Sequence, residues 1–389
     1  ITFVNLNAQN PWIIRDDFSS NSNYWHLSDD STLHTYFSDD GYHVDVKGSK
    51  SYTITKRLSL DEKHDYKIEM IFQVVSTIDK DLPNGLTFGA GENAKQAYDF
   101  VITGNGIYAA RQITLTGLND IEAPKFAMNA IRIGIGKQNK LTVTKREGYW
   151  EFFINDVQMR MSQPYPFVGD RIGFFVNGKT HILITSFKVY DWTLAKGLPQ
   201  YEKEPVVFTK LYDNFYDNKK EWVDKSNASA NIYLNNYYEV ECKTDGAYGL
   251  WNFADVGLYS DCLIETELEH ISGTEEYGYG LIFGLKDIDN FFYFKIADGG
   301  YKITSDEKDE WRPMVDWTDT AVIRKGNYTP NHLEVRSMGK DWKFFINGHL
   351  LESLTAKYFF GKNFGLYVED KQKVRMNYIK VAYLYYPKD

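Results

Sequence analysis

Three glutamates, Glu265, Glu267 and Glu269, occupy alternate positions in the run from Ile264 to His270. Alternate residues of an extended strand lie on one face, so neighbouring carboxylates of this run stand about 6–7 Å apart. Two carboxyl groups at about this separation can act as acid and as nucleophile or base in the hydrolysis of a glycosidic bond. The same pattern is typical of the solvated face of an antiparallel sheet, and the sequence leaves both interpretations open.

Aromatic side chains form a second candidate site, since Phe, Tyr and Trp make up 16% of the chain. A flat ring stacks on the C–H groups of a sugar while neighbouring polar groups bond its hydroxyls. We expect rings in loops, not rings in strand cores, to do this. The predicted carbohydrate-binding residues are Trp251, Tyr259, Tyr277 and Trp311 in the second half, and Tyr108 and Arg111 in the first. Trp317 is expected to have a structural role.

Other chemistries lack the residues that they need. The eight histidines show no H-E-x-x-H or other metal-ligand spacing, and no serine lies in a G-x-S-x-G turn. A net charge of −9, without a local cluster of Lys and Arg, disfavours nucleic-acid binding. Cys242 and Cys262 fit no zinc motif, and the sequence leaves open whether they are buried free thiols or a disulfide.

The elements that must position these residues repeat along the chain. Asp16-Asp17-Phe18 followed by Trp25 matches Asp213-Asn214-Phe215 followed by Trp222, with seven residues from Phe to Trp in both copies. Residues 85–89, 150–156, 172–176 and 187–190 match 280–284, 342–348, 364–368 and 379–382 in the same order. Ordered landmarks at nearly constant spacing predict two related units.

Hydrophobic periodicity predicts strands throughout. Residues 66–74, 140–145, 331–336 and 375–381 alternate with period two, and turn sequences such as Asn105-Gly106 and Asn347-Gly348 separate such runs. The chain is therefore predicted to be all-β, with two tandem antiparallel jelly-roll β-sandwiches. We place them at residues 10–193 and 209–389, joined by a linker at 194–208 that contains Gly, Pro and charged residues.

The N-terminal residues 1–9 have no counterpart in the second half. They are apolar and then small and polar, like the end of a secretory signal of the Bacteroidetes type cleaved near Ala8 or Gln9, although a basic start is lacking. The alternative is an ordinary edge strand. No internal run approaches the ~20 apolar residues of a membrane-spanning helix. We expect a secreted, periplasmic or cell-surface protein that does not span a membrane.

The second half carries a recognisable series of segments: 279–284, 289–296, 331–335, 342–348 and 364–368. The series resembles bacterial concanavalin A-like lectin/glucanase modules, including laminin-G-like and 3-keto-disaccharide hydrolase-like domains. The resemblance covers nearly all of residues 210–386 and, more weakly, residues 15–192. It implies a jelly-roll fold and does not specify an activity.

Two further expectations come from this resemblance. The glutamate run is similar in part to the acidic triplet of family-16 glycosidases, which implies Glu265 as nucleophile and Glu269 as acid, with Glu267 tuning their ionisation. The family's central acid is Asp, and the equivalent strand of the first half has only Glu69. Jelly-roll modules also often hold a structural calcium ion near the joined termini. The candidate calcium ligands are Asp16, Asp17, Asp191 and Asp213.

The leading interpretation is a tandem carbohydrate-binding, lectin-like protein without evident catalytic machinery. Its expected partner is a polysaccharide or glycan, and calcium is the one expected cofactor. A glycoside hydrolase that uses the carboxylates of the second unit is the first alternative. A protein-binding structural or adhesion scaffold is the second.

Overall fold

The computed structural model describes residues 10–198, 203–274, 276–308, 310–356 and 358–386. These residues form strands, turns and loops without a helix, which confirms the predicted all-β class. The chain divides into two compact units between Glu204 and Pro205. The predicted signal-peptide remnant at residues 1–9 lies outside the described residues.

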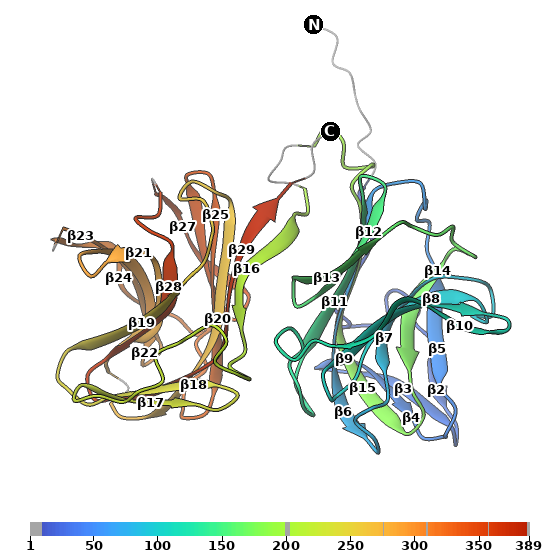
Figure 1. Ribbon diagram of the computed structural model, residues 1–389, viewed down its shortest axis with the longest axis horizontal. Helices are drawn as coiled ribbons and strands as arrows, with labels where there is room; N and C mark the ends of the chain where they lie inside the picture. Colours follow the sequence, from blue (N-terminus) through green and yellow to red (C-terminus); the bar gives the residue numbers. More distant parts are fainter. Residues whose placement is uncertain (1–9, 199–202, 275, 309, 357, 387–389) are drawn as a thin grey trace, which may run out of the picture. The chain divides into compact units, whose positions relative to one another are not determined.

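The described part of the first unit forms two antiparallel sheets (Figure 1). The larger contains β1 (Trp12–Asp16), β2 (Ser28–Asp29), β3 (Leu33–Ser38), β4 (Gly41–Val46), β6 (Tyr66–Thr77), β11 (Asn139–Arg146), β12 (Tyr149–Ile154), β13 (Val157–Ser162) and β15 (Thr180–Asp191). Its order is β13-β12-β11-β6-β15-β4-β3-β2, and β1 also pairs with β15. The smaller contains β5 (Tyr52–Arg57), β7 (Asn84–Ala90), β8 (Ala97–Ile102), β9 (Ile107–Thr114), β10 (Gly117–Phe126) and β14 (Arg171–Val176). Its order is β10-β9-β8-β7-β14-β5.

The described part of the second unit has the same plan. Its larger sheet contains β16 (Val206–Asp213), β17 (Ala230–Leu234), β18 (Tyr238–Cys242), β20 (Cys262–Ser272), β25 (Pro330–Met338), β26 (Asp341–Ile346), β27 (His349–Thr355) and β29 (Lys373–Tyr385). The order is β17-β18-β29-β20-β25-β26-β27, and β16 pairs with β29. Its six-stranded sheet contains β19 (Ala247–Phe253), β21 (Tyr279–Asp287), β22 (Asn290–Ala297), β23 (Gly300–Glu307), β24 (Glu310–Asp319) and β28 (Asn363–Glu369), in the order β19-β28-β21-β22-β23-β24.

Each unit is a jelly-roll β-sandwich around its own hydrophobic core. Period-two alternation decides which residues fill that core. On β22, Phe292 and Phe294 belong to the core, while Phe291 and Tyr293 belong to a separate cluster on the other side of the sheet. We call the side of a sheet that points away from the core its outer face. Every candidate site below lies on such a face or in a loop.

Glycines let neighbouring strands approach and bulge at the repeated landmarks. Gly284 has a φ of +60°, and the pairing of β21 with β22 shifts register after Phe283. Gly89, at the matching place in the first unit, has a φ of +58°. A Cβ atom at Gly280 would lie 2.1 Å from the carbonyl oxygen of Phe294. A bulge and a close backbone approach thus accompany the two glycines of this strand, while descent of both units from one duplicated module stays a prediction.

The predicted linker and cysteines also have definite places. Val206 to Phe208, which the sequence placed in the linker, are the first residues of β16. Cys242 and Cys262 are free thiols buried in the core of the second unit, so the disulfide alternative is not what the structure has. Burial raises the pKa of Cys262 to about 12, so this thiol stays protonated near neutral pH.

Within the described residues, no helix has the length and apolar character needed to cross a membrane.

Candidate functional site

The three predicted carboxylates share the outer face of the larger sheet in the second unit. Glu265, Glu267 and Glu269 lie on β20, and Ile264 and Leu268 on the same strand point into the core. The alternation predicted from the sequence is therefore correct. The question is what surrounds the carboxylates.

The neighbouring strand β29 supplies a polar partner to each of them. The Nζ atom of Lys380 lies 2.8 Å from Oε1 of Glu265. The Nδ2 atom of Asn377 donates to Glu267 at 3.0 Å and to Glu269 at 2.6 Å. A substrate would have to displace these internal bonds before it reached the carboxylates. The geometry thus favours a structural hydrogen-bond ladder over a catalytic pair.

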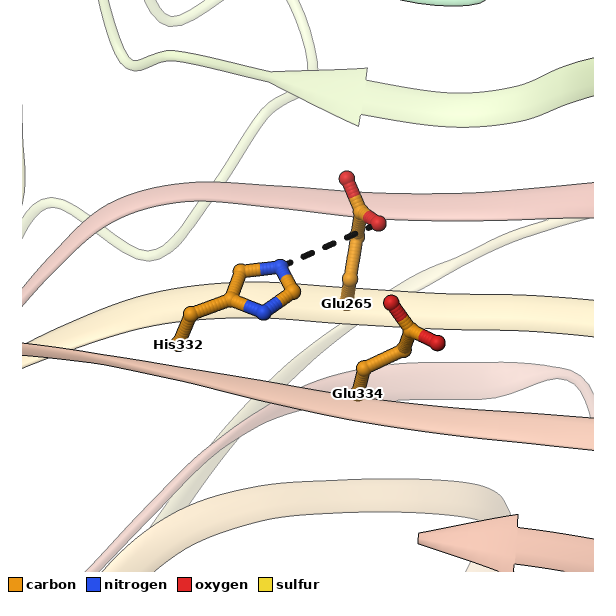
Figure 2. Close-up of side chains that lie close together, drawn as sticks. All are labelled: Glu265, His332 and Glu334. Carbon is orange, nitrogen blue, oxygen red and sulfur yellow. Dashed lines mark ion pairs between the residues drawn. The ribbon is translucent and has the colours of Figure 1, made fainter. Parts of the chain in front are cut away.

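Figure 2 shows Glu265 beside His332 and Glu334 from β25. Their potential ligand atoms all lie within 4.8 Å of one another, and His332 Nε2 is 3.8 Å from Glu265 Oε2. Arg336 forms an ion pair with Glu334, and Lys380 forms one with Glu265. Two cations thus already balance the two carboxylates, so we do not assign a metal to this cluster.

The first unit keeps one acid at the equivalent position, as the sequence alignment of the two halves predicted. Glu69 pairs with Lys188 on β15 in the same register in which Glu265 pairs with Lys380 on β29. Burial alone would raise the pKa of Glu69, but Lys67, Lys140 and Lys188 outweigh it and lower the pKa to about 2. The acid shared by both units is therefore part of a buried ion-pair network.

A different surface has the character expected of a sugar site. On the outer face of the six-stranded sheet of the second unit, the rings of Tyr293 and Tyr367 are stacked, with centroids 5.1 Å apart and planes at 6°. The ring of Trp311, from the edge strand β24, lies 5.5 Å from that of Tyr293. The tyrosines are 2% and 5% exposed, whereas Trp311 is 53% exposed. The tyrosines thus form a base, and the tryptophan offers ring surface to solvent.

An ion pair lies beside these rings. Lys295 on β22 contacts Glu369 on β28, and its Nζ atom is 5.0 Å from the ring centroid of Tyr293 and 5.3 Å from that of Trp317. Trp317 is 46% exposed. Burial raises the pKa of Tyr293 to about 12, so its hydroxyl keeps its proton as a hydrogen-bond donor. We call Tyr293, Tyr367, Trp311, Trp317, Lys295 and Glu369 the aromatic face.

Several residues predicted to bind sugar belong to this face or border it. Trp311 is a member. Trp251 lies on β19 opposite Gly365 of β28, is 38% exposed, and follows the core residue Leu250, so it shares the outer face. Tyr277 is 43% exposed and precedes Gly278, whose amide donates to Glu369. Trp251 and Trp311 lie in strands, and not in the loops that the sequence suggested.

The other predicted aromatics lie elsewhere. Tyr259 is 74% exposed in a loop and pairs with Tyr358, their centroids 5.5 Å apart. The prediction for Tyr108 was wrong, because this residue lies in β9 and is a 6% exposed member of the core. Its ring makes an edge contact with that of Phe100, with centroids 6.5 Å apart, so little of it is available to a ligand.

Arg111 lies on the outer face of the smaller sheet of the first unit. Its guanidinium is 5.1 Å from the ring centroid of Phe175, and Nη2 is 3.5 Å from Asp99. Strand pairing places Thr87, Asp99 and Arg111 in one row, as Ile282, Tyr293 and Thr304 form one row in the second unit. The first unit therefore has a buried carboxylate where the second has the central tyrosine of the aromatic face.

Five members of the aromatic face were missed as binding residues from the sequence: three aromatic residues and the ion pair of Lys295 and Glu369. Tyr293 and Tyr367 were assigned to framework segments, and Trp317 was expected to be structural. The signal was present in the alternation of β22, because once Phe292 and Phe294 face the core, Tyr293 must face away from it. Trp317 lies on the exposed edge strand β24, six positions after Trp311, and the pairing of β24 with β23 changes register between the two.

The four predicted calcium ligands have other tasks. Asp16 accepts hydrogen bonds from the backbone of Phe18 at 2.8 Å and from Trp25 Nε1 at 2.6 Å. Asp213 makes the same pair of bonds, to Phe215 at 2.8 Å and Trp222 at 2.9 Å. Asp17 accepts from Ser19, and Asp191 lies 2.7 Å from His64. These aspartates stabilise turns and clamp tryptophans, and the calcium expectation stays a prediction.

No protein-family model matches the sequence, and no curated protein matches it either. Among solved structures, the chain is similar to carbohydrate-binding module CBM66 from Bacillus subtilis, at 15% identity and a TM-score of 0.32, covering 44% of this chain and 96% of that one. It is also similar to an endo-β-1,3-glucanase from Pyrococcus furiosus, at 10% identity and a TM-score of 0.35, covering 48% of this chain and 97% of that one. A third similar structure is the Caenorhabditis elegans galectin LEC-6, at 15% identity and a TM-score of 0.25, covering 41% of this chain and 98% of that one. At these values the likeness carries no argument about ligand or reaction, and membership in a particular lectin-like family stays a prediction.

Proposed function

We propose that the second unit binds a carbohydrate on its aromatic face and does not hydrolyse it. The observation that carries this is the exposure of Trp311 and Trp317 beside the partly buried pair of Lys295 and Glu369. Exposed rings provide stacking surfaces for sugar C–H groups, and the ammonium and carboxylate provide a donor and an acceptor for hydroxyls. Stacked tyrosines beneath hold these groups in place without offering their own faces to solvent.

The partners of the three glutamates support the second part of the proposal, that these residues do not hydrolyse the bound glycan. Glu265, Glu267 and Glu269 bond to Lys380 and Asn377 of the same sheet. Hydrolysis requires two carboxyl groups that reach the scissile bond from opposite sides. A row of carboxylates held by its own sheet does not offer that arrangement.

The test is a glycan array, followed by titration of the best-binding oligosaccharide into the full chain. We expect Trp311→Ala and Trp317→Ala each to weaken binding at least tenfold. Tyr259→Ala, an aromatic that is 74% exposed outside the aromatic face, is the matched control and should bind like the wild type. Equal binding by all four proteins, or no binding to any plant, algal or host glycan, would contradict the proposal.

A reducing-sugar assay on the same polysaccharides tests the second half of the proposal. We expect no release by the wild type. Release that Glu265→Gln abolishes would show a glycoside hydrolase instead.

A further inference from the structure

The larger sheet of the first unit carries three of the chain's eight histidines on one outer-face patch. Strand pairing places His34 of β3, Asp45 of β4 and His181 of β15 side by side in one row. His43 of β4 lies in the next row, opposite Tyr36 of β3. Core residues Tyr42, Val44 and Val46 alternate with the histidine and aspartate of β4, so these point outward. The proposed carbohydrate site of the second unit has no part in this patch.

The two central imidazoles face one another. His43 Nδ1 and His181 Nε2 are 2.9 Å apart. On its far side, His43 Nε2 lies 2.8 Å from Oδ1 of Asp40. Because a carboxylate only accepts hydrogen bonds, the neutral form of the His43 ring carries its proton on Nε2, which also lies 2.8 Å from Ser38 Oγ, and presents the lone pair of Nδ1 toward His181. Tyr36 stacks on the His43 ring at 4.5 Å and 3°, which restrains the plane of the imidazole.

We infer that His43 and His181 form a binding site for a divalent transition-metal ion of the Zn²⁺, Co²⁺ or Ni²⁺ class. The ion takes the place of the proton between the rings: the His181 proton moves from Nε2 to Nδ1, and both facing nitrogens then present lone pairs. Metal–nitrogen bonds of about 2.0–2.1 Å in a tetrahedral arrangement put the two nitrogens about 3.3 Å apart. An ion bound in this way lies beside the line that joins the two nitrogens, so each ring turns toward it within its own plane and the nitrogens separate by a few tenths of an ångström from the observed 2.9 Å.

The surroundings fit the same assignment. A carboxylate that accepts from the remote nitrogen of a ligating histidine orients the ring and makes it a stronger ligand, which is the position of Asp40. Asp45 is paired in register with both His181 and His34, so the sheet places a carboxylate-bearing residue in the row next to His43. Imidazole nitrogens favour these borderline ions over calcium or magnesium, which prefer oxygen.

The second unit has other residues at the positions that match His43 and His181. Matching strand registers align His43 with Glu239 and His181 with Lys373. There, Lys373 Nζ lies 2.7 Å from Oε1 of Glu239. Arg375 also donates to Oε2 of Glu239 at 2.9 Å, so ion pairs satisfy the sheet at this point. The first unit instead has two imidazoles here, and therefore two nitrogens that can ligate a metal.

The test is titration of the full chain with Co²⁺ alone, followed by its visible absorption, and with Zn²⁺ by calorimetry. We expect one ion per chain, visible bands of a nitrogen-ligated low-coordinate Co²⁺, and a higher melting temperature with Zn²⁺. The double variant His43→Glu with His181→Lys installs the ion pair of the second unit and should fold while losing binding at least tenfold. His332→Gln, a histidine of the carboxylate cluster, is the control and should keep full binding.

Three results would overturn the assignment. They are no binding below millimolar metal, undiminished binding by the folded double variant, and loss of binding in His332→Gln. Where circular dichroism shows that the double variant does not fold, His181→Gln replaces it with the same expected loss, because an amide removes the ligating ring and leaves His43 and Asp40 in place.

Discussion

The buried carboxylate of Asp99 makes the pH dependence of the first unit testable with one substitution. Burial raises the pKa of Asp99 from its ordinary value of 3.8 to about 6, even though Thr87 donates to it at 2.6 Å and Arg111 lies nearby. The difference of about two pH units corresponds to about 3 kcal/mol. Because the folded state holds the proton more tightly, ionised Asp99 destabilises the unit. This penalty is small at pH 4, grows as the pH rises toward 6, and is then constant.

Asp99→Asn mimics the protonated form and removes that penalty at every pH. Between pH 4 and pH 7.5, the stability of the variant relative to the wild type is therefore expected to rise by about 2–3 kcal/mol. Hydrogen exchange of peptides from β8, measured by mass spectrometry in a urea series, reports on the unit that contains Asp99. Asp39→Asn, in the exposed β3–β4 turn, is the control and should show no such change. A relative stability of Asp99→Asn that stays constant or falls over this range would refute the reasoning.

Three further substitutions test separate parts of the structure. Glu69→Gln should lower the free energy of unfolding of the first unit by about 3 kcal/mol at pH 7, and this loss should shrink as the pH falls from 4.5 toward 2. The reason is that the lowered pKa of Glu69 gives stability only while the carboxylate is ionised. A loss of stability that does not change with pH in urea unfolding would contradict this. Asp16→Asn should lower the melting temperature by the same amount with calcium or with EGTA, because its oxygens accept from Phe18 and Trp25; a loss seen only with calcium would favour the ion. Gly365→Ala should lower the melting temperature of the second unit by at least ~5 °C, since the new Cβ would lie 1.9 Å from the backbone oxygen of Leu250. Gly300→Ala is the control and should leave the melting temperature nearly unchanged, because the nearest atom to its Cβ would lie at 3.4 Å.

The fold was predictable because its signals are local. Alternation along β6, β11, β25 and β29 fixes both the strand and the side that faces the core. The turn Asn347-Gly348 has φ values of +50° and +79°, as its residue types predict. Asn347 was read as a turn residue only, yet its amide also donates to Val322 at 2.7 Å and Asn331 at 2.8 Å. Such long-range partners leave no trace in the local pattern.

The candidate site was predictable only in part, because residue type does not reveal which ring is covered. Tyr108 and Trp311 both follow turn-like segments, yet one is 6% exposed and the other 53%. The difference arises because Tyr108 points into the core from the inner strand β9, whereas Trp311 lies on the outer face at the edge strand β24. The glutamates of β20 had the right spacing for catalysis, but their partners come from β29, about a hundred residues further along the chain.

Comparison of the two units by register separates framework from function more sharply than either unit alone. Glu69 with Lys188 and Glu265 with Lys380 occupy the same place in both ladders, so this pair belongs to the framework. Positions that differ in kind are the ones free to specialise. Tyr293 faces outward in the second unit at the position of Asp99 in the first. His43 faces outward in the first unit at the position of Glu239 in the second. The same sandwich thus presents an aromatic surface in one unit and paired imidazoles in the other, which is why we assign the two units different ligands.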